Sequence, residues 1–124
     1  MAVVVTNTGR AWFAKKAAGT ETGTPSFVAW GTGAGTAGVT DTTLFTEASE
    51  ARVSGTLSTV TTTVTDDTLN LAGTMTVAGA GKTITNVGQF DASSAGDMLM
   101  KADFTGLALD VGDSIAFTLK IKMA

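Results

Sequence analysis

The chain contains no cysteine, histidine or tyrosine and only one proline. Without cysteine it has no disulfides and no thiolate metal sites. The absence of all three residue types also removes the commonest general bases, the thiol nucleophiles and most metal ligands. We therefore expect a protein that is not an enzyme and that carries no cofactor.

Carboxylates remain as candidates for chemistry. The closest pairs are Asp66 with Asp67 and Asp110 with Asp113, and both lie in turn-like sequence. Aspartate is common in turns because its side chain accepts hydrogen bonds from nearby backbone N–H groups. Turn capping is therefore the expected role of both pairs. Weak calcium binding by loop oxygen atoms and hydrolysis by paired carboxylates are the alternatives.

Charge is scarce as well. Charged residues make up 15% of the chain, against roughly 25% in an average soluble domain, and the net charge is -3. The cations are scattered along the sequence: Arg10, Lys15, Lys16, Arg52, Lys82, Lys101, Lys120 and Lys122. A domain without a basic stripe cannot neutralise a run of phosphates, so nucleic acid is not an expected partner. We interpret the weakly charged surface as one that a partner protein covers.

Long apolar runs are missing too. No stretch approaches the roughly 20 apolar residues of a membrane span. The apolar stretch at residues 2–5 is too short for the core of a signal peptide, and no cation precedes it. We therefore expect no association with a membrane.

What the chain does contain is a regular alternation of apolar and polar residues. Near the C-terminus every second side chain is apolar: Ile115, Phe117, Leu119, Ile121 and Met123. A period of two predicts a strand with one face toward a core. Further stretches have the same pattern or strand-favouring composition: residues 26–30, 51–58, 68–77, 83–90 and 98–104. Strands separated by glycine and aspartate turns, without intervening helices, predict an antiparallel β-sandwich in a single domain over residues 1–124.

The first 25 residues have a different composition. The alanine-rich stretch at residues 10–18 predicts a short helix, which Asn7 or Thr8 caps and which Gly19 ends in the left-handed conformation. We interpret residues 1–25 as an N-terminal arm with a short helix ahead of the β-domain.

Several bulky apolar side chains allow two interpretations. Trp12 and Trp30 are either core anchors or contacts with a neighbouring subunit, where tryptophan is common. Leu44 and Phe45 lie in a stretch that allows one helical turn. Residues 98–100, Met-Leu-Met, place apolar bulk on both faces of a strand, which predicts that both faces are covered.

Two glycine-containing stretches resemble phosphate-binding motifs. Residues 33–38 match G-x-G-x-x-G, but the residues that follow open no amphipathic helix, which the dinucleotide-binding motif requires. Gly81-Lys82-Thr83 resembles the end of a P-loop, but Thr76 stands where that loop needs glycine. We therefore predict a flexible loop at the first stretch and a tight hairpin turn at the second.

Longer patterns of glycine and turn residues follow one another along the chain. The first is formed by Asn7, Gly9, Ala14 and Gly19, and the second by Gly31, Gly33, Ala37, Asp41, Thr42, Leu44 and Glu47. Residues 86–99 contain Asn-Val-Gly-Gln-Phe-Asp-Ala and then Gly-Asp-Met-Leu, and residues 111–115 read Val-Gly-Asp-Ser-Ile. This order resembles a broad group of small tailed-bacteriophage virion proteins, namely capsid decoration, head-fibre and tail-fibre-like structural proteins. Where that group has Glu-x-Gly-Leu-Phe-Asp, this chain has Asn-Val-Gly-Gln-Phe-Asp at residues 86–91.

The resemblance implies a β-sandwich of jelly-roll character on the exterior of the particle. A fibre needs length to reach a receptor, and this chain has no repetitive stalk. We therefore expect a capsid decoration (cement) protein that bridges subunits of the major capsid protein. Such proteins sit at local symmetry points, so a homotrimer or a homodimer is expected. The alternative is a head-fibre or tail-fibre module that binds a host receptor or glycan, which the aromatic content of 6% disfavours.

Two segments are predicted to contact the capsid: residues 2–19 and the glycine-rich stretch at residues 31–43. The predicted interface residues are Val3, Val4, Val5, Trp12, Phe13, Trp30, Gly33, Gly35, Leu44 and Phe45. Deletion of residues 2–19 is expected to weaken capsid binding without unfolding the sandwich.

Overall fold

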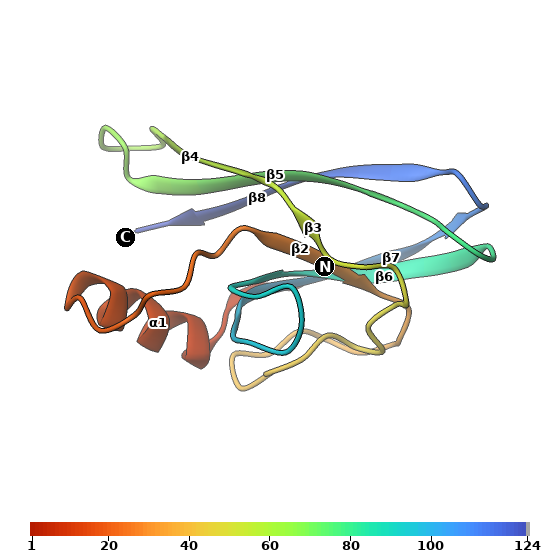
Figure 1. The fold of residues 1–124 in the computed structure, drawn as a ribbon, viewed down its shortest axis with the longest axis horizontal. Helices are drawn as coiled ribbons and strands as arrows, with labels where there is room; N and C mark the ends of the chain where they lie inside the picture. Colours follow the sequence, from red (N-terminus) through yellow and green to blue (C-terminus); the bar gives the residue numbers. More distant parts are fainter. Residues whose placement is uncertain (124) are drawn as a thin grey trace.

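The computed structural model describes residues 1–123 and consists of two antiparallel β-sheets and one helix (Figure 1). The elements in chain order are β1 (Val3–Val5), α1 (Asn7–Ala17), β2 (Phe27–Gly31), β3 (Val53–Ser54), β4 (Thr56–Val60), β5 (Thr68–Thr76), β6 (Lys82–Phe90), β7 (Met98–Leu109) and β8 (Ser114–Lys122). The five-stranded sheet has the order β1-β7-β6-β2-β3, and the three-stranded sheet has the order β4-β5-β8. The predicted antiparallel β-sandwich is confirmed; residue 124 of the predicted domain lies outside the described residues.

One long ribbon of two strands links the sheets. Thr76 faces Ser114 where β5 pairs with β8, and Lys82 faces Leu109 where β6 pairs with β7. Val77 continues the ladder through the bend, because it donates to Asp113 O at 2.9 Å and accepts from Gly112 N at 3.0 Å. The ribbon therefore folds over from one sheet into the other, which gives the sandwich its jelly-roll character. The prediction of a hairpin turn at residues 81–83 is wrong: these residues end the crossing between the sheets and begin β6, and β5 and β6 belong to different sheets.

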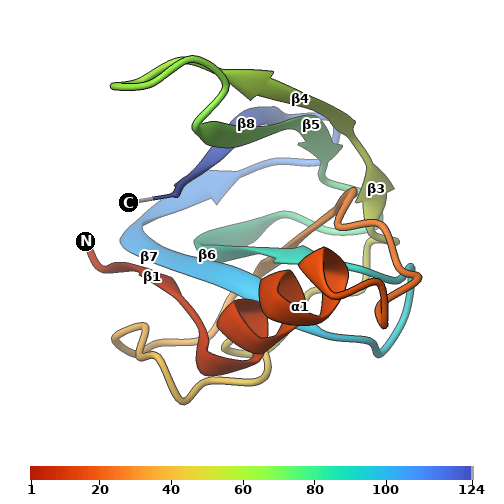
Figure 2. The ribbon, with the colours of Figure 1, turned by 90° about the vertical axis from the view of Figure 1, so that its left-hand side faces the viewer.

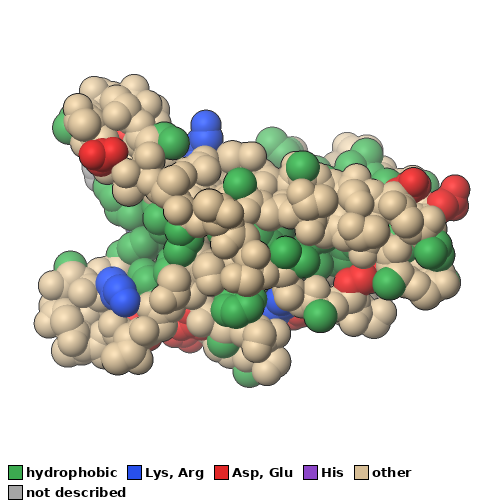
Figure 3. All heavy atoms as spheres, turned by 45° about the horizontal axis from the view of Figure 1, so that its top comes forward, with side chains coloured by type: hydrophobic (Ala, Val, Ile, Leu, Met, Phe, Trp, Pro, Cys, Tyr) green, Lys and Arg blue, Asp and Glu red, His purple; other side chains and the backbone are tan. Residues whose placement is uncertain are grey.

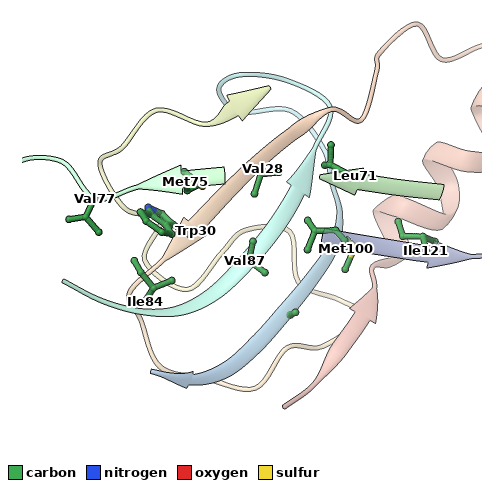
Figure 4. Close-up of a cluster of buried hydrophobic side chains, with 11 residues drawn as sticks. Val28, Trp30, Leu71, Met75, Val77, Ile84, Val87, Met100 and Ile121 are labelled. Atoms are coloured by element: carbon green, nitrogen blue, oxygen red, sulfur yellow. The ribbon is translucent and has the colours of Figure 1, made fainter. Parts of the chain in front are cut away.

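The core lies between the two sheets (Figure 4). Its buried members come from both: Val28, Trp30, Leu71, Met75, Val77, Ile84, Val87, Met100, Ala102, Leu119 and Ile121. Trp30 is 0% exposed, and its ring packs edge-to-face on Phe117 with 6.4 Å between centroids. Leu119 and Ile121 are buried while the residues between and beside them are exposed, as the alternation predicted for this strand.

The outer face of the five-stranded sheet is covered by an irregular segment, residues 32–50, which we call the covering loop (Figure 1). Its Leu44 packs with Ala29, Phe90 and Met98 in a second apolar cluster. Because Met100 belongs to the first core, both faces of β7 are covered at its start, residues 98–100, as the Met-Leu-Met sequence predicted. Leu44 lies in irregular backbone, so the helical turn allowed by the sequence does not form there.

The covering loop is fastened to the sheet and is not a loose connection. Asn86 is 0% exposed, and its side-chain amide pairs with both the N–H and the C=O of Phe45, at 3.0 and 3.1 Å. Gly33 donates to Phe45 O at 2.9 Å and accepts a hydrogen bond from the Thr85 hydroxyl. A Cβ at position 35 would lie 2.7 Å from Cζ of the Phe45 ring, so the close approach of this ring requires glycine there. The flexible loop predicted at residues 33–38 is therefore held at several points.

The N-terminal segment is part of the sandwich. β1 pairs with β7, with Val4 opposite Lys101. Thr6, one residue before the predicted caps, is the N-cap of α1: its hydroxyl accepts from Gly9 N at 2.9 Å and donates to Met98 O at 2.6 Å. Gly19, with φ of 78°, follows the C-terminal end of the helix, as predicted. Residues 3–17 therefore do not form a separate arm.

The sandwich is closed along one side and open along the other (Figure 2). On the closed side, β3 of one sheet continues through Gly55 into β4 of the other. On the open side, β1 and β8 are the outermost strands of their sheets, and no chain connection joins them. Figure 2 shows the N-terminus and the end of β8 on this open side.

Candidate functional site

The open side of the sandwich carries a groove between β1 and β8. The N-terminus and β1 contribute Met1, Val3 and Val5, and β8 and the residue after it contribute Phe117, Leu119, Ile121 and Met123. We call this surface the β1–β8 groove. One stretch, completed by Phe13 and Arg10 of α1, has a volume of about 510 Å³, and the other, completed by Phe104, about 240 Å³. Figure 3 shows hydrophobic side chains in the hollow between the two sheets.

The period-two pattern produces this apolar groove. Alternate residues of each strand face the space between the sheets, so two neighbouring edges place two apolar rows opposite each other. The floor is closed, because Leu119 and Ile121 are 6% and 3% exposed. The margins are open, because Val3 and Met123 are 54% and 49% exposed. A contiguous apolar surface at an open margin is typical of an interaction site.

Cations that are scattered in the sequence divide into two groups in the structure. Three are paired with carboxylates: Arg52 with Glu47, Lys82 with Glu50 and Lys101 with Asp41. The others lie on α1 or near the end of β8: Arg10, Lys15, Lys16, Lys120 and Lys122. Within residues 1–123, none of this second group lies within 4.0 Å of a carboxylate. Arg10, Lys120 and Lys122 line the β1–β8 groove, which is therefore apolar inside and positive at its rim.

The predicted interface residues fall in different places. Trp12, Trp30 and Leu44 are 3%, 0% and 5% exposed and belong to the interior, so they have almost no surface for a partner. Gly33 and Phe45 are half-buried in the covering loop, where Gly35 is exposed. Val3, Val5 and Phe13 do line the groove or lie at its margin, whereas Val4 is half-buried beside them. The structure thus brings Val3, Val5 and Phe13 together at the groove, whereas Gly33, Gly35 and Phe45 do not line it.

The contribution of β8 to this surface was not predicted from the sequence. Its alternation signalled a strand with one apolar face, but alternation does not reveal that the strand is an edge. The lysines at positions 120 and 122 were a usable signal, since natural proteins often place lysine on edge strands.

The two aspartate pairs cap turns. The carboxylate of Asp67 accepts hydrogen bonds from the backbone N–H groups of Val64, Thr62 and Thr63, and these bonds lower the pKa of Asp67. Asp113 accepts from Asp110 N at 2.8 Å in the turn before β8. Both arrangements match the role expected from sequence.

A third group of carboxylates was not anticipated. Oxygen atoms of Glu21, Asp91 and Asp97 lie within 4.8 Å of one another. Asp91 already accepts from the indole N–H of Trp12 at 3.1 Å and from Asp97 N at 2.7 Å, and Glu21 accepts from Gly23 N at 3.1 Å. The bond from Trp12 ties α1 to the loop between β6 and β7, and the other two bonds order that loop and the loop after α1, which gives the group a structural role.

An ion pair fastens the covering loop to the five-stranded sheet. The ammonium of Lys101, which is 0% exposed, lies 3.1 Å from Asp41 and 3.2 Å from the centre of the Phe45 ring. The Gly38 N–H and the Lys101 ammonium lower the pKa of Asp41, although its burial acts in the opposite direction. In the same way the N–H groups of Ala37 and Ala2 lower the pKa of Asp103. The covering loop is therefore fixed by charge as well as by hydrogen bonds.

Glu50 joins the covering loop to both the core and the crossing ribbon. It accepts from Trp30 Nε1 at 3.0 Å and from Ala78 N at 3.1 Å, and it pairs with Lys82. Burial alone would raise the pKa of Glu50, but these three donors lower it from 4.5 to about 2.

A lowered pKa makes stability depend on pH. The stabilisation from Glu50 is fully present above pH 4.5 and is lost as the pH falls toward 2. We expect Glu50→Gln to lower the free energy of unfolding by about 2 kcal/mol at pH 7, because a charged hydrogen-bonding partner is lost. Between pH 4.5 and 2, the free energy of unfolding of the Glu50→Gln variant should fall less than that of the wild type, as measured by urea denaturation at each pH. An unchanged acid dependence would contradict the role assigned to Glu50.

Comparison with known proteins finds no match among protein families, curated proteins or solved structures. Among residues 1–123, no helix has the length and hydropathy needed to cross a membrane.

Proposed function

We propose that this chain is a structural protein of a tailed-bacteriophage particle, namely a decoration (cement) protein that binds the outer capsid surface and bridges subunits of the major capsid protein. The observation that carries the proposal is the β1–β8 groove. It is an open, apolar side of a firmly packed sandwich, flanked by two strand edges. Such a surface is suited to bind a neighbouring protein.

The residue inventory supports a binding role over a catalytic one. The chain has no histidine, cysteine or tyrosine. The aspartate pairs cap turns, and Glu50 and Asp41 are engaged in ion pairs. The low pKa of Glu50, about 2, keeps that carboxylate ionised, which makes it a poor general acid or base near neutral pH.

A bridging protein stabilises a shell by mass action. It binds the assembled lattice and not the separated subunits, so dissociation of the shell must also break the added contacts. An interface of ordinary size buries roughly 1,200–2,000 Å² in total. Repetition over the lattice makes modest single contacts effective, and a homotrimer or homodimer at a local symmetry point would increase the number of contacts per bound unit.

The proposal is tested with particles of a phage that lacks the gene for this chain. These particles should lose infectivity at a lower temperature or at low salt, and added purified protein should cosediment with them and restore resistance. The matched control is Val111→Ala, which changes an exposed side chain in the turn before β8 and should restore resistance as well as the wild type. Particles that resist heat equally with and without the protein, and do not bind it, would refute the cement function.

A further inference from the structure

We propose that the β1–β8 groove binds one extended segment of the partner protein, in which apolar and acidic residues alternate and which pairs as an additional strand with the free edge of β8. This proposal deepens the cement function, because it specifies the chemistry of the partner segment. It rests on that function only for the identity of the partner.

The free edge of β8 supplies the backbone contacts. β8 runs from Ser114 to Lys122 and pairs with β5 on one side only, because it is the outermost strand of its sheet. One row of its N–H and C=O groups therefore faces away from β5. Strand addition to such an edge gains affinity from main-chain hydrogen bonds and specificity from hollows that receive alternate side chains.

The groove supplies those hollows. Its two stretches follow the same strands in order: Val3 lies opposite Phe117 and Leu119 in one, and Val5 lies with Ile121 and Met123 in the other. Volumes of about 240 and 510 Å³ leave space for apolar side chains of an added strand. Burial of such side chains would cover Val3 and Met123, which are about half exposed.

The rim selects the charge of the occupant. Arg10, Lys120 and Lys122 line the groove, and in the described part of the chain none has a carboxylate within 4.0 Å. The Lys122 ammonium donates to the Thr63 hydroxyl at 2.7 Å, which holds it beside the strand. Acidic residues on the polar face of an added strand would lie next to these cations.

Lys120 and Lys122 disfavour a second copy of this chain as the occupant of the groove. Two β8 edges brought together would place lysine-bearing strands beside each other, and lysine on an edge strand is a common means of preventing edge-to-edge pairing. A partner segment with acidic side chains removes that repulsion. The occupant is therefore an acidic segment of another protein.

The first experiment uses purified full-length protein and two synthetic eight-residue peptides, one alternating valine with glutamate and one alternating valine with lysine. Binding is followed by NMR of the ¹⁵N-labelled protein. We expect the glutamate peptide to shift the amide signals of β8 and β1, to bind more weakly at high salt, and to bind at least tenfold more tightly than the lysine peptide.

Matched charge reversals test the rim. The double variant Lys120→Glu with Lys122→Glu should bind the glutamate peptide about tenfold more weakly, because two exposed ion pairs are replaced by two repulsions. The control variant Lys15→Glu with Lys16→Glu makes the same change in net charge on α1 and should bind within about threefold of the wild type. Equal loss in both variants would overturn the proposal, because it would show a general charge effect.

Particle binding separates this proposal from the cement function. If the glutamate peptide binds the groove but particles do not bind the protein, the cement function fails and the groove assignment stands. If particles bind wild type and the Lys120→Glu, Lys122→Glu variant equally, the groove assignment fails and the cement function stands. Concentration-dependent shifts of β8 signals without peptide would identify a second copy as the occupant, and β8-dependent binding to phosphatidylglycerol vesicles would identify a lipid surface; either result overturns the proposal.

Discussion

Replacing Trp30 with alanine should lower the free energy of unfolding by about 3–5 kcal/mol, the range observed when a buried tryptophan or phenylalanine is truncated. Trp30 is 0% exposed and packs against Phe117 of the opposite sheet. Its indole N–H also donates to Glu50, so the truncation leaves that carboxylate with one donor fewer. Urea denaturation at pH 7 measures the change.

The control for this experiment is Val111→Ala, at a side chain that is 57% exposed. A surface substitution of this kind changes stability by about 0.5 kcal/mol or less. If Trp30→Ala were as stable as this control, Trp30 would not be a core residue that joins the sheets. The alternative considered from sequence, in which Trp30 contacts a neighbouring subunit, would then regain support.

Gly9→Ala should lower the free energy of unfolding by about 3 kcal/mol. In a free helix the same change stabilises by about 1 kcal/mol, because alanine has the higher helix propensity. Here the new Cβ would lie 2.1 Å from Leu99 O, and a backbone carbonyl inside a sheet has little freedom to move. The helix must therefore shift away from β7, which weakens the Thr6 cap that bonds to Met98 O. Thermal and urea denaturation measure the loss.

Gly38→Ala is the matched control for Gly9→Ala. A Cβ at Gly38 would meet only Asp41 Oδ1, at 3.9 Å, so no backbone needs to move. We expect a change within about 0.5 kcal/mol. A stabilised Gly9→Ala protein would show that α1 does not pack on β7 at Leu99.

These contacts also revise one prediction from the sequence. Deletion of residues 2–19 was expected to leave the sandwich folded. The structure shows that the deletion would remove β1, the buried Thr6 and the buried Trp12. We now expect this truncation to destabilise the whole fold, so point substitutions at the groove rim are the better test of partner binding.

Local patterns in the sequence were sufficient to predict most strands. The alternation from Ile115 to Met123 predicted β8, and Gly19 predicted the end of α1. The Met-Leu-Met sequence at residues 98–100 predicted a strand buried on both faces. Each of these signals depends on neighbours within a few residues, which is the range over which periodicity and capping act.

Features that depend on distant residues were not predictable in this way. The fixed conformation around Phe45 depends on the amide of Asn86, which is 41 residues away in sequence. Val3 and Ile121 line the same groove only because β1 and β8 happen to be the outer strands of opposing sheets. The gathering of Arg10 with Lys122 follows from the same topology. The site therefore came from the fold and not from any motif.

The most direct test of the cement function is the number of copies of this protein in purified phage particles, measured by quantitative mass spectrometry against the major capsid protein. A protein that bridges capsid subunits over the shell must be present in numbers comparable to the lattice, so we predict hundreds of copies per particle. A handful of copies would identify a fibre component instead, and absence of the protein from mature particles would contradict the account.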